Sequence, residues 1–405
     1  LDNGITLIVQ PESVSKTVTV VGHVDHDAKL QEPVGKDGVG RLLAALFDYG
    51  TTTLDRTAFH KALDEIAATE SAGDDFKLAV PTAGFERGMQ LLADNELHPA
   101  LPQSAFDVQQ KTLSRTLAGE MQSPRYKMFR ALSKGLLPAG DPGLREATPA
   151  SVDKLNLPDA KAYLAQTYRP DLTTIAIVGD IAPDAARSVV EKYFGGWKAS
   201  GPKPDVIPKP VPLNPASYTV VPNTYASQDQ VLMGHVLGVN LANPDRYALQ
   251  LANDILGGNG FASRLMVDIR VKHGYAYGAS SGMNIDRSRS IFYVYYGSDP
   301  DKVAPVDALV SSNIEALQNT PIKADELTNA RQFQIRSIPL GVSSVNGIAR
   351  SLLSWSWRGE PLDQPMVAAK YYLDLTAEQV QDACKKYLKP KDLVQVVQGP
   401  APKKH

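Results

Sequence analysis

The chain has 405 residues, of which 43% are hydrophobic and 21% are charged. This composition is typical of a folded protein and excludes an intrinsically disordered one, and the length is sufficient for two or three domains. With 42 basic and 44 acidic residues, the formal charge of −2 provides no field for a phosphate backbone and argues against a nucleic-acid partner.

The first half of the chain contains clear strand and helix patterns. The segment TVTVVGHV at residues 17–24 alternates and predicts a strand. Residues 38–49 have apolar side chains at i, i+4, i+7 and i+8, a spacing that predicts an amphipathic helix ended by Gly50. A threonine followed by proline at residues 148–149 predicts a helix start, and LTTIAIVGD at residues 172–180 predicts a second strand.

The next segment, residues 198–215, has the sequence KASGPKPDVIPKPVPLNP. Its six prolines disfavour both a helix and a central strand. We therefore expect an extended linker that separates an N-terminal domain, residues 1–197, from a C-terminal domain, residues 216–405.

The second half repeats the signals of the first. VGHV at residues 21–24 recurs as MGHV at residues 233–236, an offset of 212. The segment from Tyr168 into IAIVGD recurs from Tyr387 into VQVVQG, an offset of 219 to 221. Thr376 and Gln379 form the pattern of a capping box that starts the helix before Tyr387. The sequence therefore predicts an α+β fold of two similar mixed α/β domains, each of about 200 residues.

The densest group of potential metal ligands is His23-Val24-Asp25-His26-Asp27. On a strand, His23 and Asp25 share one face while His26 points to the other, so at most two of these side chains converge. We interpret the group as a polar strand end, with a metal site as the alternative.

Two glycine-containing patterns suggest other chemistry. Residues 278–282, GASSG, match the G-x-S-x-G pattern of a nucleophilic serine, but a strand rather than a helix is predicted after them. Residues 257–260, GGNG, have no preceding strand and no Gly-Lys-Ser/Thr sequence, which a phosphate-binding loop requires. We interpret the first as a small-residue strand and the second as a helix cap followed by a bend.

Residues 38–51, GVGRLLAALFDYGT, resemble the active-site helix of the pitrilysin/insulinase zinc metallopeptidases, in the branch of mitochondrial processing peptidase. The family has H-x-x-E-H within the frame G-x-x-H-x-x-E-H-x-x-x-x-G-T. Arg41, Ala44 and Ala45 occupy the three functional positions here. A protonated guanidinium and two methyl groups have no lone pair for zinc, so the resemblance implies that the zinc motif is lost.

The family's remaining zinc ligand is a glutamate on a later helix. The resemblance aligns its acidic pair with Gln109 and Thr116 of this chain. The chain is therefore expected to bind no metal and to have no catalytic residue of its own, with zinc supplied by a partner subunit.

A second family pattern is retained. Residues 263–277 match S-R-L-x-x-x-x-R-x-x-x-G-x-x-Y, with Arg270 and Tyr277 at the arginine and tyrosine. In the family these two side chains hydrogen-bond the substrate carbonyl beside the scissile bond, and both are suitable donors to a carbonyl oxygen. The alternative is that Arg270 only offsets a helix dipole and that Tyr277 is an ordinary strand aromatic.

The resemblance implies a non-catalytic, substrate-binding subunit of a heterodimeric zinc peptidase, inactive alone and paired with a homologous subunit that has H-x-x-E-H. Peptides would be the substrates. Two alternatives stay open: a structural subunit like the core proteins of respiratory complexes, and a peptide-binding module without cleavage.

The remaining expectations concern the cysteine and the location. The single cysteine, Cys384, excludes an internal disulfide and a thiolate metal cluster built by this chain alone. The apolar runs are strand-sized, so we expect no membrane span. The start at Leu1 is compatible with removal of a secretory leader, and we expect a periplasmic protein, with the cytoplasm as the alternative.

Overall fold

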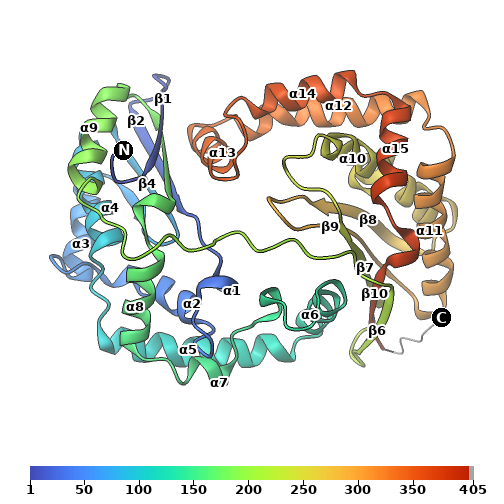
Figure 1. Ribbon diagram of the computed structural model, residues 1–405, viewed down its shortest axis with the longest axis horizontal. Coiled ribbons are helices and arrows are strands. Elements are labelled where there is room, and N and C mark those ends of the chain that lie inside the picture. Colours follow the sequence, from blue (N-terminus) through green and yellow to red (C-terminus); the bar gives the residue numbers. More distant parts are fainter. Residues whose placement is uncertain (401–405) are drawn as a thin grey trace. The chain divides into compact units, whose positions relative to one another are not determined.

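The computed structural model describes residues 1–400 of the chain (Figure 1). The chain forms two compact units that are discontinuous in sequence. Unit 1 consists of residues 1–119, 145–207 and 339–362, and unit 2 of residues 120–144, 208–338 and 363–405, of which the last five lie outside the described residues. Each unit contains a mixed five-stranded sheet with helices, which confirms the predicted α+β class.

The sheet of unit 1 has the strand order β1-β5-β2-β4-β3. β1 and β5 are parallel, and all the other neighbours are antiparallel. The five strands are β1 (Thr6–Pro11), β2 (Thr17–Val24), β3 (Thr69–Ser71), β4 (Asp75–Pro81) and β5 (Thr173–Gly179).

The sheet of unit 2 has the order β6-β10-β7-β9-β8, with β6 and β10 parallel and the other neighbours antiparallel. It therefore has the same topology as the sheet of unit 1. Its strands are β6 (Ser217–Pro222), β7 (Asp229–Leu237), β8 (Ala276–Asn284), β9 (Ser290–Ser298) and β10 (Val394–Gly399).

The predicted repeat is visible in the pairing register of the two sheets. Gly22 of β2 is opposite Ile175 of β5, and Gly234 of β7 is opposite Val394 of β10. These pairs are displaced by 212 and 219 residues, the offsets found in the sequence. The two halves are thus similar in the pairing of their strands as well as in their sequence patterns.

The helices surround the two sheets. Those of unit 1 are α1 (Ala28–Gln31), α2 (Val39–Ala44), α3 (Arg56–Asp64), α4 (Phe85–Leu97), α7 (Pro149–Val152), α8 (Leu157–Thr167), α9 (Pro183–Phe194) and α13 (Val345–Trp357). Those of unit 2 are α6 (Pro124–Leu136), α10 (Asp245–Asn253), α11 (Val303–Asn319), α14 (Gln364–Asp374) and α15 (Ala377–Tyr387). The chain passes from one unit to the other within α5 (Gln103–Gln122) and α12 (Ala324–Gly341).

Each sheet has one face covered by a helix from the other half of the chain. In unit 1, α13 packs on β2 and β5, where Leu352 and Leu353 meet Val21 and Val178. In unit 2, α6 packs on β6, β7 and β10 through an apolar cluster that includes Leu132. Burial of a leucine contributes about 1.5–3 kcal/mol, so both helices stabilise the sheets that they cover.

Gly135 allows α6 to lie close to the sheet. A Cβ atom at this position would be 2.4 Å from Cγ1 of Val394 and 3.0 Å from Oγ of Ser217. Any side chain at residue 135 would therefore force α6 away from β10.

The predicted helix at residues 38–49 is shorter than expected. α2 ends at Ala44, and a 3₁₀ turn, Phe47–Tyr49, follows it. The backbone tightens there because Leu46 N–H donates to the carbonyl of Leu43, three residues earlier, at 2.8 Å. Gly50 ends the segment with φ of 86°, as expected from its position.

The predicted helix starts are confirmed. Thr148 and Thr376 each accept a hydrogen bond from the backbone three residues later, in capping boxes completed by Ser151 and Gln379. Between α9 and β6, residues 195–216 contain no helix or strand. The role of residues 198–215 as a linker, and the domain boundaries drawn from it, stay predictions.

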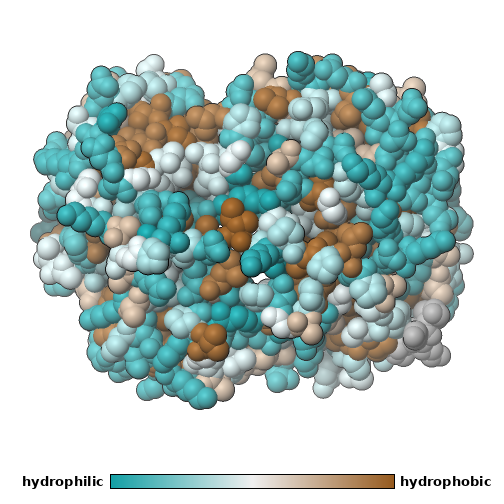
Figure 2. Space-filling model, viewed as in Figure 1, coloured by the Kyte–Doolittle hydropathy of each residue, from teal (hydrophilic) through white to brown (hydrophobic). Residues whose placement is uncertain are grey.

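Among residues 1–400, no helix combines the length and the apolar character that crossing a bilayer requires. Hydrophobic residues form separate patches among polar ones on the face seen in Figure 2.

We predict that Gly135→Leu lowers the midpoint of urea unfolding, since overpacking typically costs about 1–3 kcal/mol. Gly119→Leu is the matched control, because a Cβ atom at this glycine of α5 has no neighbour within 4 Å. The free energy of unfolding of the control is expected to rise by roughly 1 kcal/mol, because leucine has a higher helix propensity than glycine. Equal midpoints for the two variants would contradict the close contact of α6 with β10.

Candidate functional site

The residues at the zinc-motif positions form no metal site. Arg41 and Ala44 lie on the exposed side of α2, and Ala45 is the C-cap residue of the helix. Gln109 of α5 donates from Nε2 to the hydroxyl of Tyr49 at 2.9 Å, so this amide binds the segment that follows α2. Thr116 is exposed farther along α5.

These side chains do not fit zinc, which takes thiolate, imidazole or carboxylate ligands. Throughout residues 1–400, no three His, Cys, Asp or Glu side chains are grouped so that they could hold a metal ion. His23 is instead paired with Asp75, with Nδ1 and Oδ1 2.8 Å apart, and its ring lies 4.6 Å from that of Trp357. This hydrogen bond lowers the pKa of Asp75, and the polar strand end interpreted from the sequence is what the structure contains.

The purified chain is expected to retain no stoichiometric zinc after incubation with zinc and dialysis, as measured by elemental analysis. Addition of a chelator should leave its thermal unfolding midpoint unchanged. The triple variant Arg41→His/Ala45→His/Thr116→Glu is the positive control, because it restores two imidazoles at i and i+4 together with the carboxylate of the remaining family ligand. One zinc ion per natural chain would contradict this prediction.

Arg270 and Tyr277 lie together in unit 2. The guanidinium carbon of Arg270 is 4.3 Å from the ring centroid of Tyr277 and 5.0 Å from that of Phe261. Both rings are largely exposed, 80% for Tyr277 and 68% for Phe261. Cation–π contacts on both rings restrain the guanidinium at the surface of the unit. The structure thus brings together the two residues selected from the sequence, while their role stays a prediction.

A bulge in β8 places Tyr277 on the outer face. Ala276 is opposite Ser298 and Ala279 is opposite Tyr296, so β8 has one residue more than β9 between these pairs. Ala276 and Ala279 are both buried, although they are three residues apart. The extra residue reverses the strand alternation and directs Tyr277 outward.

A pocket of about 550 Å³ lies beside Tyr277. Its wall includes Gln230, Tyr295 and Gly257, the last from the π-helical turn Asp254–Gly258 that continues α10. A Cβ atom at Gly257 would be 2.5 Å from the backbone nitrogen of Ser281, so glycine lets this turn lie against β8. The predicted cap and bend at residues 257–260 is therefore partly wrong, because its first two glycines are helical.

Asp254 begins this π-helical turn and is buried. It accepts hydrogen bonds from Gln334 Nε2 at 2.7 Å and from Gln250 Nε2 at 3.5 Å. Burial raises its pKa from 3.8 to about 7, against the opposing effect of these two donors. The folded chain therefore keeps this proton at pH values where the unfolded chain has lost it.

Because of this proton, we predict that Asp254 lowers the free energy of unfolding as the pH rises from about 4 to about 7, by roughly 1.4 kcal/mol per pH unit. Above this window the loss is complete and constant. Asp254→Asn should flatten the dependence, measured by denaturant titrations at several pH values. Asp301→Asn, at an exposed aspartate, should not. An unchanged slope in Asp254→Asn would contradict the assignment.

Phe261, Gln230 and Tyr295 were not identified from the sequence. Tyr295 donates from its hydroxyl to Oε1 of Gln230 at 2.6 Å across neighbouring strands. The alternating pattern of β9 could have identified Tyr295 as an exposed residue, because its neighbours Val294 and Tyr296 are buried. Sequence gave no signal for Phe261, whose role depends on the turn that brings it to Arg270.

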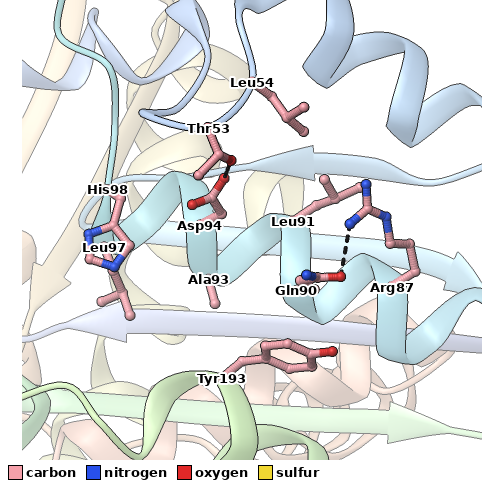
Figure 3. Close-up of a pocket in the computed structure, with 10 residues that line it drawn as sticks. All are labelled: Thr53, Leu54, Arg87, Gln90, Leu91, Ala93, Asp94, Leu97, His98 and Tyr193. Carbon is pink, nitrogen blue, oxygen red and sulfur yellow. Dashed lines mark hydrogen bonds between the residues drawn. The ribbon is translucent and has the colours of Figure 1, made fainter.

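A different pocket, of about 330 Å³, lies in unit 1 along α4. In Figure 3, Thr53 points to Asp94 and Arg87 to Gln90. These polar groups bind each other, with Thr53 Oγ1 2.5 Å from Asp94 and Arg87 Nη1 2.8 Å from Gln90. This pocket offers less reactive chemistry than the surface around Arg270.

Comparison with protein families matches residues 154–333 to the peptidase M16 inactive domain. Two Bacillus subtilis relatives are similar over most of the chain. One, an uncharacterized zinc protease, YmxG, is 22% identical over 85% of this chain and 84% of its own length. The other, a probable inactive metalloprotease, YmfF, is 23% identical over 86% of each. Subunit 1 of the mitochondrial cytochrome b-c1 complex of Bos taurus is 24% identical over 64% of this chain and 54% of its own.

Solved structures have the same fold. The peptidase M16 inactive domain from Pseudomonas fluorescens aligns with a TM-score of 0.86 and 23% identity, over 99% of this chain and 97% of that one. The periplasmic protease PqqL from Escherichia coli aligns with a TM-score of 0.81 and 19% identity, over 96% of this chain and 43% of that one. These two similarities concern the fold alone, and the match of residues 154–333 to the peptidase M16 inactive domain agrees with the resemblance found in the sequence.

Proposed function

We propose that this chain, whose residues 154–333 match the peptidase M16 inactive domain, is the non-catalytic, substrate-binding subunit of a heterodimeric zinc metallopeptidase that cleaves peptides. The observation that supports this most is an asymmetric loss. Arg41, Ala44 and Ala45 cannot bind zinc, whereas the half-buried Arg270 and the exposed Tyr277 form a pair of donors at the surface.

The division of chemistry follows from these groups. A homologous partner with an intact H-x-x-E-H would contribute zinc and the activated water. Arg270 and Tyr277 would donate hydrogen bonds to a carbonyl oxygen of the peptide and stabilise the negative charge that develops there. The aromatic rings restrain the guanidinium in advance, which lowers the entropy cost of positioning it.

The test is to mix the chain with a homologous H-x-x-E-H subunit from the same source and to follow hydrolysis of quenched fluorescent peptides. We predict that Arg270→Ala and Tyr277→Phe each lower kcat/KM by at least about tenfold, as a lost donor to a developing oxyanion does. Zinc content of the mixture should stay unchanged.

Tyr225→Phe is the matched control for Tyr277→Phe, because the side chain of Tyr225 is 99% exposed and lies outside the candidate site. Arg187→Ala serves the same purpose for Arg270→Ala, at an exposed arginine of unit 1. Unchanged hydrolysis with both Arg270→Ala and Tyr277→Phe would remove the donor role.

Similarity to the cytochrome b-c1 subunit favours a second candidate, a structural subunit without proteolysis. Affinity purification from the native source separates the two. Recovery with an H-x-x-E-H homologue supports the peptidase, whereas recovery with a membrane redox complex supports the structural subunit.

The likeness to the periplasmic protease PqqL supports a periplasmic location for this chain. Cell fractionation with antibody detection tests it. Recovery of the chain in the cytoplasmic fraction alone would overturn the location without affecting the proposed chemistry.

A further inference from the structure

Helix α6 covers one face of the unit 2 sheet and packs most closely on β6, β7 and β10. On β9, Ile291, Tyr293 and Tyr295 lie on the side opposite to the buried residues of that strand. Ile291 and Tyr293 pack, partly buried, against the apolar cluster of α6, whereas Tyr295 is 39% exposed. The ring of Tyr293 lies over Gly282, where a Cβ atom would be 2.3 Å from the tyrosine hydroxyl oxygen.

A pocket of about 760 Å³ occurs where α6 meets this face of the sheet. Its volume lies within the range of sites that bind small ligands or side chains. Apolar side chains from both α6 and the sheet form most of the wall, among them Met128, Leu132, Leu136, Leu232 and Ile291. Arg125, whose guanidinium carbon is 5.7 Å from the ring centroid of Phe129, is a cation in the same wall. The pocket therefore suits an apolar occupant and disfavours a cationic one.

This pocket adjoins the surface around Arg270 and Tyr277. Ser280 and Tyr295 line both the α6 pocket and the pocket beside Tyr277. Along β8, Ser280 follows Tyr277 by three residues, but the bulge between them makes these residues span only about two residues of regular strand, roughly 7 Å. A peptide in extended conformation covers this distance with about two residues.

We propose that the α6 pocket is a specificity subsite that receives one large apolar side chain of the bound peptide, about two residues from the carbonyl held by Arg270 and Tyr277. The inference rests on the proposed function for the identity of its occupant. It implies that this chain selects peptides by their sequence, in addition to binding a carbonyl group.

The test measures binding to the full single chain, without a partner, by fluorescence anisotropy. The probes are two labelled, unstructured peptides that differ only by Phe or Ala at one central position, and a third with Arg there. The natural chain should bind the Phe peptide about 10- to 100-fold more tightly than the Ala peptide, the gain expected from burying an aromatic side chain. Its affinity for the Arg peptide should not exceed its affinity for the Ala peptide.

Asn284→Trp, at a residue of β8 that lines the α6 pocket but not the pocket beside Tyr277, should fill the α6 pocket and remove the preference for Phe while leaving the affinity for the Ala peptide unchanged. Ser133→Phe, from the α6 side of the same pocket, is a second filling variant in case the first does not fold. Ser312→Trp, at an exposed serine of α11, is the matched control and should keep the preference. Thermal unfolding checks that each variant is folded.

Equal affinity of the natural chain for the Phe and Ala peptides would overturn the subsite. So would a preference that survives in the folded pocket-filling variants. If the preference exists and is lost in the folded pocket-filling variants, but mixtures with an H-x-x-E-H subunit do not cleave peptides, the proposed function fails and the subsite remains. If such mixtures cleave peptides without discriminating Phe from Ala, the subsite fails and the proposed function remains.

Discussion

Each sheet of this protein is stabilised on one face by a helix from the other half of the chain. α13 buries leucines against β2 and β5, and α6 does so against β7 and β10, with Gly135 permitting the contact. Each unit therefore contains residues from both halves of the chain, and neither half contains a complete unit.

The same exchange determines where binding surface is available in unit 2. α6 packs most closely on β6, β7 and β10, and Tyr295 of β9 and Tyr277 of β8 stay exposed toward the edge of the sheet. The bulge in β8 then directs Tyr277 toward the same face as Ser280. The packing of α6 and the bulge in β8 thus place the donor groups of Arg270 and Tyr277 beside an apolar pocket. By contrast, the zinc-motif region of unit 1 retains its helix and glycine turn without any ligand.

The repeat, the helix starts and part of the helix at residues 38–49 could be predicted from local sequence patterns. The repeat followed from offsets that reappear in the strand register, and the caps at Thr148 and Thr376 followed from side chains that satisfy the first helix donors. The helix at residues 38–49 was overextended because apolar periodicity does not distinguish a continuous α-helix from α-helix followed by a 3₁₀ turn. All four of its apolar positions are nevertheless buried.

Sequence alone determined which chemistry is absent and which side chains are retained, because an alanine or an arginine lacks a zinc-binding lone pair in any fold. Only the tertiary structure decided that Phe261 stacks on Arg270, that Asp254 is buried, and that α6 belongs to the second sheet. These facts depend on contacts between residues far apart in the chain. No local propensity encodes such contacts, since they are set by which apolar surfaces meet when the whole chain packs.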